Sequence, residues 1–566
     1  MRRTSIPLFC LALLLTLVDP ASGATATETA PDALGRFADE TLSAAYPADG
    51  PGAAALVRWR GKTILRRGYG MANLDLGVPI TPDSVFEVGS VTKQFTAASI
   101  LRLSEQGKLE LADPVTRFLP DFPTGGRVVT LQQLLTHTSG VPSYTSMPEW
   151  LPRWREDMSV ETLIGIFAGK PFDFEPGTSW SYSNSGYILL GAVIEKVSGR
   201  SYEEYVEEEL FAPLGMANTR FGHQEEIVRG RVSGYHRGLN GLENAPYLSL
   251  TQPYAAGSLM STVDDLALWS DALEAGRVVS PASRDRMFTP AIVRGGEQDG
   301  VSTRYGLGYG ILEVAGRTVH EHGGGIPGFA ADLLRVPDED MVVVILSNQP
   351  ESAPSRLARQ IVERAFASAA GAVPPVVLPA DELDRYVGVY RVAGSPDARQ
   401  TVTRDGTTLR LQRTGGSLRE LRPLGDDRFG FAEETDRLRF RRDAAGGVVS
   451  LEFDHGFGPV FRSPRTDEPL PHERAAIAVD PAIYDDYVGV YALAPGFDIA
   501  VSREGDGLFA RATGQERLEI FPEAIDRFFF RAIDAEIEFV REPGSGRTGS
   551  LVLHQGGQDL PAPRKP

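Results

Sequence analysis

The stretch Phe86-Glu-Val-Gly-Ser-Val-Thr-Lys-Gln-Phe-Thr-Ala-Ala-Ser-Ile100 decides how the rest of the sequence is interpreted. Gly89 permits a tight entry and an apolar helical pattern follows, which predicts Ser90 at the start of a helix over 92–106. Lys93 is three residues further on, and residues three apart share a helix face, so its amine can reach the Ser90 hydroxyl. A serine hydroxyl becomes a good nucleophile only when a neighbour takes its proton. Alone, Ser-x-x-Lys also fits a helix cap followed by a surface lysine.

A second motif, Trp180-Ser-Tyr-Ser-Asn-Ser-Gly186, places Tyr182 and Asn184 two residues apart. In an extended or loop segment, side chains at i and i+2 point to the same side, so a phenol and an amide would stand together. Such a pair offers a proton carrier and a group that positions a carbonyl or a lysine. A Ser/Asn turn ahead of a helix over 187–197 explains the same residues without any chemistry.

The third motif is His322-Gly-Gly-Gly-Ile-Pro-Gly-Phe329, which precedes the buried-strand run Met341–Leu346. Glycines beside a histidine let a substrate backbone approach closely, although a glycine-rich hairpin with a surface histidine has the same pattern. His320 and His322 lack the i, i+4 spacing of a helical His-Glu-x-x-His zinc motif, so no metal site is predicted. The sequence also contains no Gly-x-Ser-x-Gly nucleophile elbow.

The order Ser-x-x-Lys, Tyr-x-Asn, His-Gly-Gly resembles that of the serine β-lactamase and penicillin-recognising peptidase superfamily. It is most similar to the branch of class C β-lactamases, D,D-carboxypeptidases, D-aminopeptidases and related esterases. Similar flanking segments are Leu134–Gly140, Phe174–Gly177, Pro213–Met216 and Ala256–Ser261. The resemblance covers about residues 31–368 and implies an α/β (α+β) fold, in which an antiparallel sheet is flanked by helices and carries an inserted helical lobe.

The resemblance implies that Ser90 attacks a carbonyl and forms an acyl-enzyme, while Lys93 and Tyr182 handle the proton. Which of the two is the general base stays open at this point. Asn184 would orient Lys93 and the substrate amide, and no cofactor is implied. The remaining implied site residues are the substrate-binding His322, Gly323 and Gly324, with backbone N–H groups of Ser90 and Gly325 as the oxyanion hole.

His322 bears most on the substrate. Many members of the superfamily carry Lys-Thr-Gly here, and that lysine grips a substrate carboxylate, whereas histidine with a pKa of about 6.5 is mostly neutral above pH 7. D-Aminopeptidases carry His-Gly-Gly, so we expect hydrolysis of peptides, amides or esters with D-residues, at their N-terminus. The alternatives are a promiscuous esterase, a weak β-lactamase, a D,D-carboxypeptidase, and an acylated sensor that does not turn over.

Periodicity along the chain predicts the architecture independently. Strand patterns occupy residues 53–70 and 306–347, helical patterns broken by Pro and Gly fill about 108–250, and a helix over 355–367 closes the region. Strand-rich ends around a helical middle predict one sheet built from both ends of a domain over 31–370. The active site is expected in the cleft between the sheet and the helical lobe.

A repeat follows the proline-rich linker 371–379, because Arg385–Tyr390 returns as Asp486–Tyr491. Short alternating strands with Gly, Asp and Arg turns predict two small antiparallel β-barrels over 380–468 and 480–566. They resemble the lipocalin-like barrels attached to D-aminopeptidases. Such barrels are either spacers or elements that shape the cleft.

Composition sets the remaining expectations. The chain has 566 residues, and its net charge of −18 argues against nucleic acid and anionic membranes as partners; a small peptide, amide or ester is expected instead. Met1–Arg3, apolar 6–18 and small residues 21–24 predict a signal peptide over 1–24, and hence a secreted or periplasmic protein without a stable membrane anchor. Its single cysteine, Cys10, lies in that segment. A homodimer remains one option for assembly.

Overall fold

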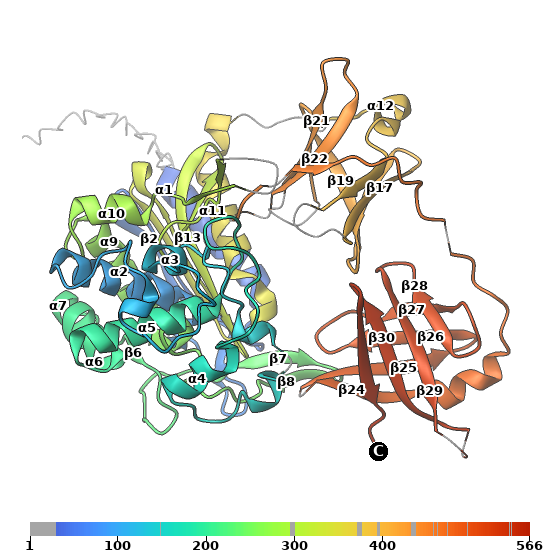
Figure 1. Cartoon of the computed structure of the whole chain (residues 1–566), viewed down its shortest axis with the longest axis horizontal. Coiled ribbons are helices and arrows are strands. Elements are labelled where there is room, and N and C mark those ends of the chain that lie inside the picture. Colours follow the sequence, from blue (N-terminus) through green and yellow to red (C-terminus); the bar gives the residue numbers. More distant parts are fainter. Residues whose placement is uncertain are drawn as a thin grey trace, which may run out of the picture.

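The computed structural model describes residues 30–566 except 148, 295–299, 371–375, 393–396, 432–436 and positions 455, 457, 461, 473, 495, 543 and 545. The signal peptide expected at residues 1–24 lies outside the described residues. Within the described chain, no helix combines the length and apolar character needed to cross a bilayer. The chain forms an α/β domain followed by two β-barrels, shown in yellow-orange and red in Figure 1.

A six-stranded antiparallel sheet forms the centre of the first domain, in the order β12-β13-β14-β15-β1-β2. Its strands are β1 (Ala53–Trp59), β2 (Lys62–Tyr69), β12 (Gly310–Val314), β13 (Arg317–Ile326), β14 (Phe329–Val336) and β15 (Met341–Ser347). Strand β1 pairs with β15 from Ala53↔Ser347 to Trp59↔Met341. The two ends of the domain therefore share one sheet, which confirms the predicted architecture.

Helices cover both faces of this sheet. Helices α1 (Ala30–Ala45) and α11 (Pro354–Ala370) pack together on one face, and α9 (Val263–Glu274) packs against β1 and β15 on the other. Successive side chains of a strand point to opposite faces. Accordingly, Val343 of β15 belongs to the core with α1 and α11, while Val344 belongs to the core shared with the helical lobe.

The helical lobe lies between β2 and β12 in sequence, and α5 (Asn184–Ser198) is its central helix. Ser183 caps α5 by accepting a hydrogen bond from the Gly186 N–H, and Gly199 ends it with a φ of 74°. The cap explains why the helix starts at Asn184 rather than at the predicted residue 187. Helix α5 packs against α2 (Thr92–Glu105), α3 (Leu131–Leu135), α4 (Val160–Phe167), α6 (Tyr202–Val206) and α8 (Tyr254–Gly257).

Shorter elements complete this domain. The helical ones are α7 (Ala212–Leu214), α10 (Pro281–Met287), the 3-10 turns Gly89–Val91 (η1), Val115–Arg117, Tyr144–Ser146, Leu151–Arg153, Pro337–Glu339 and Pro350–Ser352, and the π-helix Glu207–Phe211. The strands are β3 (Met71–Asn73), β4 (Val78–Pro79), β5 (Phe86–Glu87), β6 (Arg220–Phe221), β7 (Tyr235–Gly238), β8 (Gly241–Asn244), β9 (Leu259–Ser261), β10 (Ile292–Val293) and β11 (Val301–Ser302).

Each C-terminal repeat is an eight-stranded antiparallel sheet in sequential order, which confirms the two predicted barrels. The first contains α12 (Ala380–Asp384), β16 (Gly388–Arg391), β17 (Arg399–Asp405), β18 (Thr408–Arg413), β19 (Leu418–Gly425), β20 (Arg428–Gly430), β21 (Arg437–Arg442), β22 (Val448–Asp454) and β23 (Arg462–Pro464). The second contains Pro481–Ile483 (3-10), α13 (Tyr484–Tyr487), β24 (Gly489–Ala494), β25 (Phe497–Glu504), β26 (Gly507–Ala512), β27 (Leu518–Pro522), β28 (Arg527–Phe530), β29 (Ala535–Arg541), β30 (Thr548–Gln555) and β31 (Gln558–Pro563). Single bridges, Tyr390↔Arg465 and Tyr491↔Arg564, nearly close each barrel.

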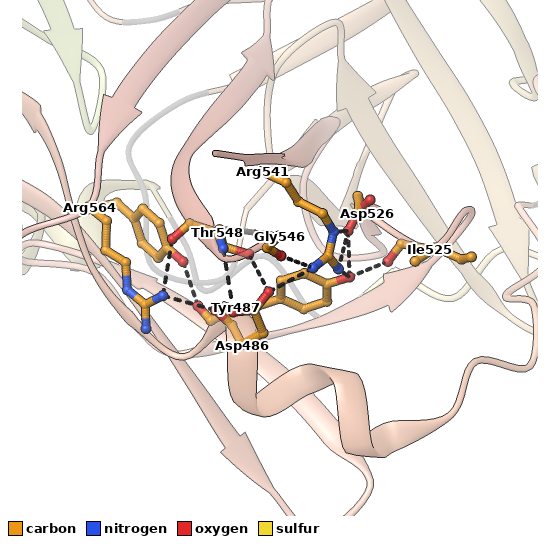
Figure 2. A network of polar contacts seen from close by, with 9 residues as sticks. Asp486, Tyr487, Ile525, Asp526, Arg541, Gly546, Thr548 and Arg564 are labelled. Atoms are coloured by element: carbon orange, nitrogen blue, oxygen red, sulfur yellow. Dashed lines mark hydrogen bonds and ion pairs between the residues drawn. The ribbon is translucent and has the colours of Figure 1, made fainter. Parts of the chain in front are cut away.

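The same polar network ties the first turn of each barrel to its strands, and Figure 2 shows it in the second barrel. Arg541 donates to Asp526 at 2.7 Å and to the hydroxyl of Tyr487 at 3.0 Å, while that hydroxyl donates to Asp526 at 2.7 Å. Arg564 donates to the carbonyl oxygens of Asp486 and Thr548. The corresponding groups of the first barrel are Tyr386, Asp427, Arg442 and Arg465. The repeat seen in the sequence is therefore also a repeat of partly buried polar contacts.

Candidate active site

Ser90 lies in η1, which leads directly into α2 at Thr92, so it stands at the start of a helix as its sequence predicts. Gly89 precedes it with a φ of 51°, in the left-handed region that favours glycine. A Cβ on Gly89 would also lie 2.8 Å from the backbone nitrogen of Gly325. The tight entry to the helix thus brings the Ser90 segment into direct backbone contact with β13.

The Lys93 amine is fully buried and has three hydrogen-bond partners. Its Nζ lies 3.0 Å from Ser90 Oγ, 2.8 Å from Asn184 Oδ1 and 2.8 Å from the carbonyl oxygen of Ala256. Burial lowers the pKa of Lys93 well below its ordinary value of 10.5, because desolvation disfavours the charged ammonium.

The hydrogen-bond partners of the amine are compatible with its neutral form. A neutral amine has two N–H donors and one lone pair. Asn184 Oδ1 and the carbonyl oxygen of Ala256 can accept both N–H groups. The lone pair is then available to the hydroxyl proton of Ser90, as the predicted role of Lys93 as a general base requires.

Tyr182 is the neutral partner in this site. Burial raises the pKa of its phenol above the ordinary value of 10, and a hydrogen bond with Ser90 only partly offsets the effect. Lys93 Nζ lies 4.9 Å from the centre of the Tyr182 ring. The phenol beside Ser90 therefore keeps its proton and is placed to donate it, whereas Lys93 is placed to accept one.

Asn184 differs locally from its prediction. It is the first residue of α5 rather than part of an extended segment shared with Tyr182, because Ser183 caps the helix. The amide nevertheless reaches the site: its Oδ1 accepts from Lys93 and its Nδ2 donates to Thr145 Oγ1 at 3.1 Å. In this orientation the oxygen of the amide faces the lysine and its nitrogen faces Thr145.

The glycine-rich end of β13 forms an edge beside Ser90. Pairing of β13 with β12 ends at Gly310↔Glu321, so within the described residues β13 has no strand partner on this side over 322–326. A Cβ on Gly324 would lie 1.9 Å from the carbonyl oxygen of Val88 and 3.0 Å from the nitrogen of Ser90. Because no side chain fits there, the two backbones meet, and the N–H groups of Ser90 and Gly325 belong to adjoining segments. Their role as an oxyanion hole stays a prediction.

His322 is buried behind this edge, on the side of Tyr305. Its Nε2 accepts a hydrogen bond from the Tyr305 hydroxyl at 2.8 Å, and its Nδ1–H donates to the carbonyl oxygen of Gly323 at 2.6 Å. Burial is the largest cause that lowers the pKa of His322 to about 3, so the imidazole is neutral at neutral pH. Direct contact of His322, Gly323 or Gly324 with a substrate remains a prediction.

The sequence alone assigns no role to three groups that contact the site. The carbonyl of Ala256 and the imidazole of His137 both lie in segments that resemble the superfamily, but neither stands out by residue type alone. Tyr305 has no motif around it and is buried with its ring 4.7 Å from that of His137. Across the described residues, no group of three or more His, Cys, Asp or Glu side chains is arranged to hold a metal ion.

The first barrel touches the rim of this site. Arg304 pairs with Asp454 at the end of β22 at 2.7 Å and donates to the carbonyl oxygen of Gly458 at 3.1 Å. A Cβ on Gly458 would lie 3.0 Å from the ring of Trp180. Arg304 directly precedes Tyr305 in the sequence, and Trp180 lies two residues before Tyr182. The first barrel therefore contacts two segments that also carry residues of the site.

The chain is similar to several known proteins. Penicillin-binding protein 4* of Bacillus subtilis (strain 168) is 27% identical over 524 residues, covering 89% of this chain and 93% of that protein. D-Aminopeptidase of Gluconobacter oxydans (strain 621H) is 28% identical over 321 residues, or 55% of this chain and 58% of that protein. The structure of a D-stereospecific amidohydrolase from Streptomyces sp. is 29% identical with a TM-score of 0.50, covering 59% of this chain and 99% of that one.

Two family models match the chain. Residues 473–561, which form the second barrel, match a domain of unknown function, DUF3471. Residues 41–367 match the Beta-lactamase model, and this region holds Ser90, Lys93, Tyr182 and the glycine-rich edge of β13. With that match and the Ser90–Lys93 geometry together, the chain belongs to the Beta-lactamase family and is a serine hydrolase.

Proposed function

We propose that this serine hydrolase is a D-aminopeptidase-like enzyme that cleaves peptides, amides or esters after an N-terminal D-residue. The observation that carries the proposal is the neutral His322 buried behind the open edge of β13, together with the Ser90–Lys93 pair. The D-aminopeptidase and the D-stereospecific amidohydrolase to which the chain is similar support D-residue substrates.

The site geometry supports a two-step acyl transfer. As Ser90 Oγ attacks the carbonyl carbon, its proton moves to the lone pair of Lys93 and the carbonyl π electrons move to oxygen. The C–N or C–O bond then breaks, and the phenol of Tyr182 gives its proton to the leaving group. Lys93 returns its proton to Tyr182, and water later repeats the attack on the acyl-Ser90 ester. This division of labour follows from the opposite pKa shifts of Lys93 and Tyr182.

The open edge of β13 supports a substrate with a backbone. A strand edge presents unpaired N–H and C=O groups that an extended peptide can match, which is a recurring mode of peptide recognition. Residues 322–326 offer such an edge beside Ser90, within the described structure. An amide or peptide therefore fits this site better than a substrate without main-chain polar groups.

The lack of charge on His322 favours substrates with a free N-terminal D-residue over substrates with a free C-terminal carboxylate. A fixed cation here would hold the free carboxylate of a C-terminal D-residue or of a β-lactam. Both ring nitrogens of His322 are engaged by Tyr305 and Gly323, and burial keeps the ring uncharged at neutral pH. The site thus lacks a carboxylate anchor at this position.

The second candidate is a penicillin-recognising D,D-carboxypeptidase. It is favoured by similarity to penicillin-binding protein 4*, because that alignment includes most of both chains rather than the first domain alone. The two candidates differ in which end of the substrate is free, so one substrate panel separates them.

The panel contains D- and L-alanine p-nitroanilide, p-nitrophenyl acetate, a peptide ending in D-Ala-D-Ala and a chromogenic cephalosporin. We expect the highest kcat/KM on the D-aminoacyl anilide and only slow turnover of the two carboxylate-bearing substrates. Faster release of C-terminal D-Ala than of the anilide would instead establish the D,D-carboxypeptidase. Equal rates on both alanine enantiomers would overturn the D-residue proposal.

Lys93 should control the acid limb of the pH–rate profile. Only its neutral form can take the Ser90 proton, and its pKa is lowered, so activity should persist far below pH 10.5 and fall as the pH drops through the lowered pKa. Lys93→Met keeps the length of the side chain without the amine and should lose about 100- to 10,000-fold in kcat. Lys196→Met on the outer part of α5 serves as the control. A Lys93→Met enzyme with near-normal kcat would assign the base elsewhere.

Asp454 should influence selectivity rather than chemistry. Asp454→Ala removes the ion pair that holds the first barrel against Arg304, so we expect a shift of up to about fivefold in the ratio of kcat/KM for bulky and small acyl groups. Asp405→Ala, in a residue that pairs with Arg410 inside the same barrel, is the matched control. If both variants keep the wild-type ratio, the barrel is a spacer at this contact.

A further inference from the structure

A histidine occupies an unusual position at the end of α3. The Thr138 N–H donates to the carbonyl of Gln133 at 2.9 Å and the His137 N–H to that of Leu134 at 3.4 Å, the pattern of a Schellman motif. The left-handed residue of this motif is usually glycine. Here it is His137, with a φ of 60°, a conformation that is strained for a residue with a Cβ. Such strain persists where the surroundings fix it, which directs attention to the side chain.

His137 holds the chain on both sides of Tyr182. Its carbonyl oxygen accepts from the Ser181 N–H at 3.0 Å, and its Nδ1 accepts from the Ser183 N–H at 3.1 Å. The imidazole and phenol ring centres are 4.3 Å apart with an angle of 40° between the planes. One residue therefore fixes the two neighbours of Tyr182 and also supports its ring.

The imidazole itself is enclosed. Its ring centre lies 4.7 Å from that of Tyr305 and 5.3 Å from that of Tyr187, and only 1% of the residue is exposed. Burial lowers the pKa of His137 well below 6.5, which favours a neutral ring. Because Nδ1 accepts, the proton is on Nε2, and that buried nitrogen has no hydrogen-bond partner in the described structure. The Nδ1 bond and the ring contacts thus set the orientation of the ring.

We infer that His137 is a positioning residue for Tyr182: it clamps Ser181 and Ser183 and supports the phenol ring, so that the phenol faces Ser90. It touches no reacting atom and acts only through Tyr182. The inference rests on the proposed function, in which Tyr182 protonates the leaving group. A displacement of about 1 Å in such a group can cost about 100-fold in rate.

Leaving groups of different basicity provide the test. An amine such as p-nitroaniline must gain a proton as the C–N bond breaks, whereas p-nitrophenolate leaves without one. A misplaced Tyr182 should therefore slow the anilide far more than the ester, while general loss of structure slows both. Both substrates are measured as kcat and KM on the full chain, together with the melting temperature.

His137→Gly removes the ring and relaxes the backbone. We expect about a 100-fold loss of kcat on the anilide and a much smaller loss on the ester. Added imidazole should restore part of the anilide rate, and the change should cause no further loss in a Tyr182→Phe background. His320→Ala, in a second largely buried histidine that stacks on Phe288, is the control for loss of a ring. Equal losses on ester and anilide, or losses that multiply with those of Tyr182→Phe, would overturn the inference.

A second pair of variants serves if His137→Gly gives no soluble protein. The Asn Oδ1 can take the place of Nδ1 and asparagine accepts a positive φ, whereas the Gln amide reaches the place of Nε2. His137→Asn should therefore retain most of the anilide rate and exceed His137→Gln. A higher anilide rate for His137→Gln than for His137→Asn would overturn the inference that His137 holds Ser183 through Nδ1. If Tyr182→Phe slows the ester and the anilide equally, the proposed role of Tyr182 fails. If Tyr182→Phe slows the anilide more than the ester but the His137 variants slow both equally, only the inference about His137 fails.

Discussion

The rest of the site depends on the burial of the Lys93 amine among three oxygen atoms. Burial disfavours an ammonium at this position and lowers the pKa of the Lys93 amine. Asn184 Oδ1 and the carbonyl oxygen of Ala256 each lie 2.8 Å from that amine, and Ser90 Oγ lies 3.0 Å from it. Packing the start of α2 against α5 and α8 therefore favours the neutral amine that the proposed general base requires.

A second constraint is the contact between two backbones. Gly89 and Gly324 are pressed against β13 and η1 respectively, and a Cβ on either would collide with main-chain atoms. This contact places Ser90 at an open strand edge, where a substrate backbone can lie. Around it lie the buried rings of His137, Tyr305 and His322 and the partly buried ring of Tyr182. Burial favours the uncharged form of each ring, so these four side chains place no charge beside Ser90 at neutral pH.

The sequence alone predicts the sheet, the helical lobe, the barrels and the principal residues of the site, since each has a local signal. Strand and helix periodicity, the returning Tyr-Val-Gly-Val-Tyr segment and the order of the three motifs are all readable without coordinates. The sequence does not predict the start of α5 at Asn184, because a serine such as Ser183 occurs both in turns and at helix caps. Tyr305 and the carbonyl of Ala256 could not be predicted, because their roles arise from tertiary contacts between distant segments. The sequence also leaves open whether Lys93 or Tyr182 is the general base, because the pKa of each group depends on its burial in the folded chain.

We propose that Ser90 is the nucleophile and that the buried amine of Lys93 activates it. The most direct measurement is mass spectrometry of the full chain after reaction with a fluorophosphonate, followed by peptide mapping of the adduct. We expect one adduct on the peptide that contains Ser90, absent from Ser90→Ala. An adduct of equal mass and rate on Ser90→Ala, mapped to another serine, would contradict it.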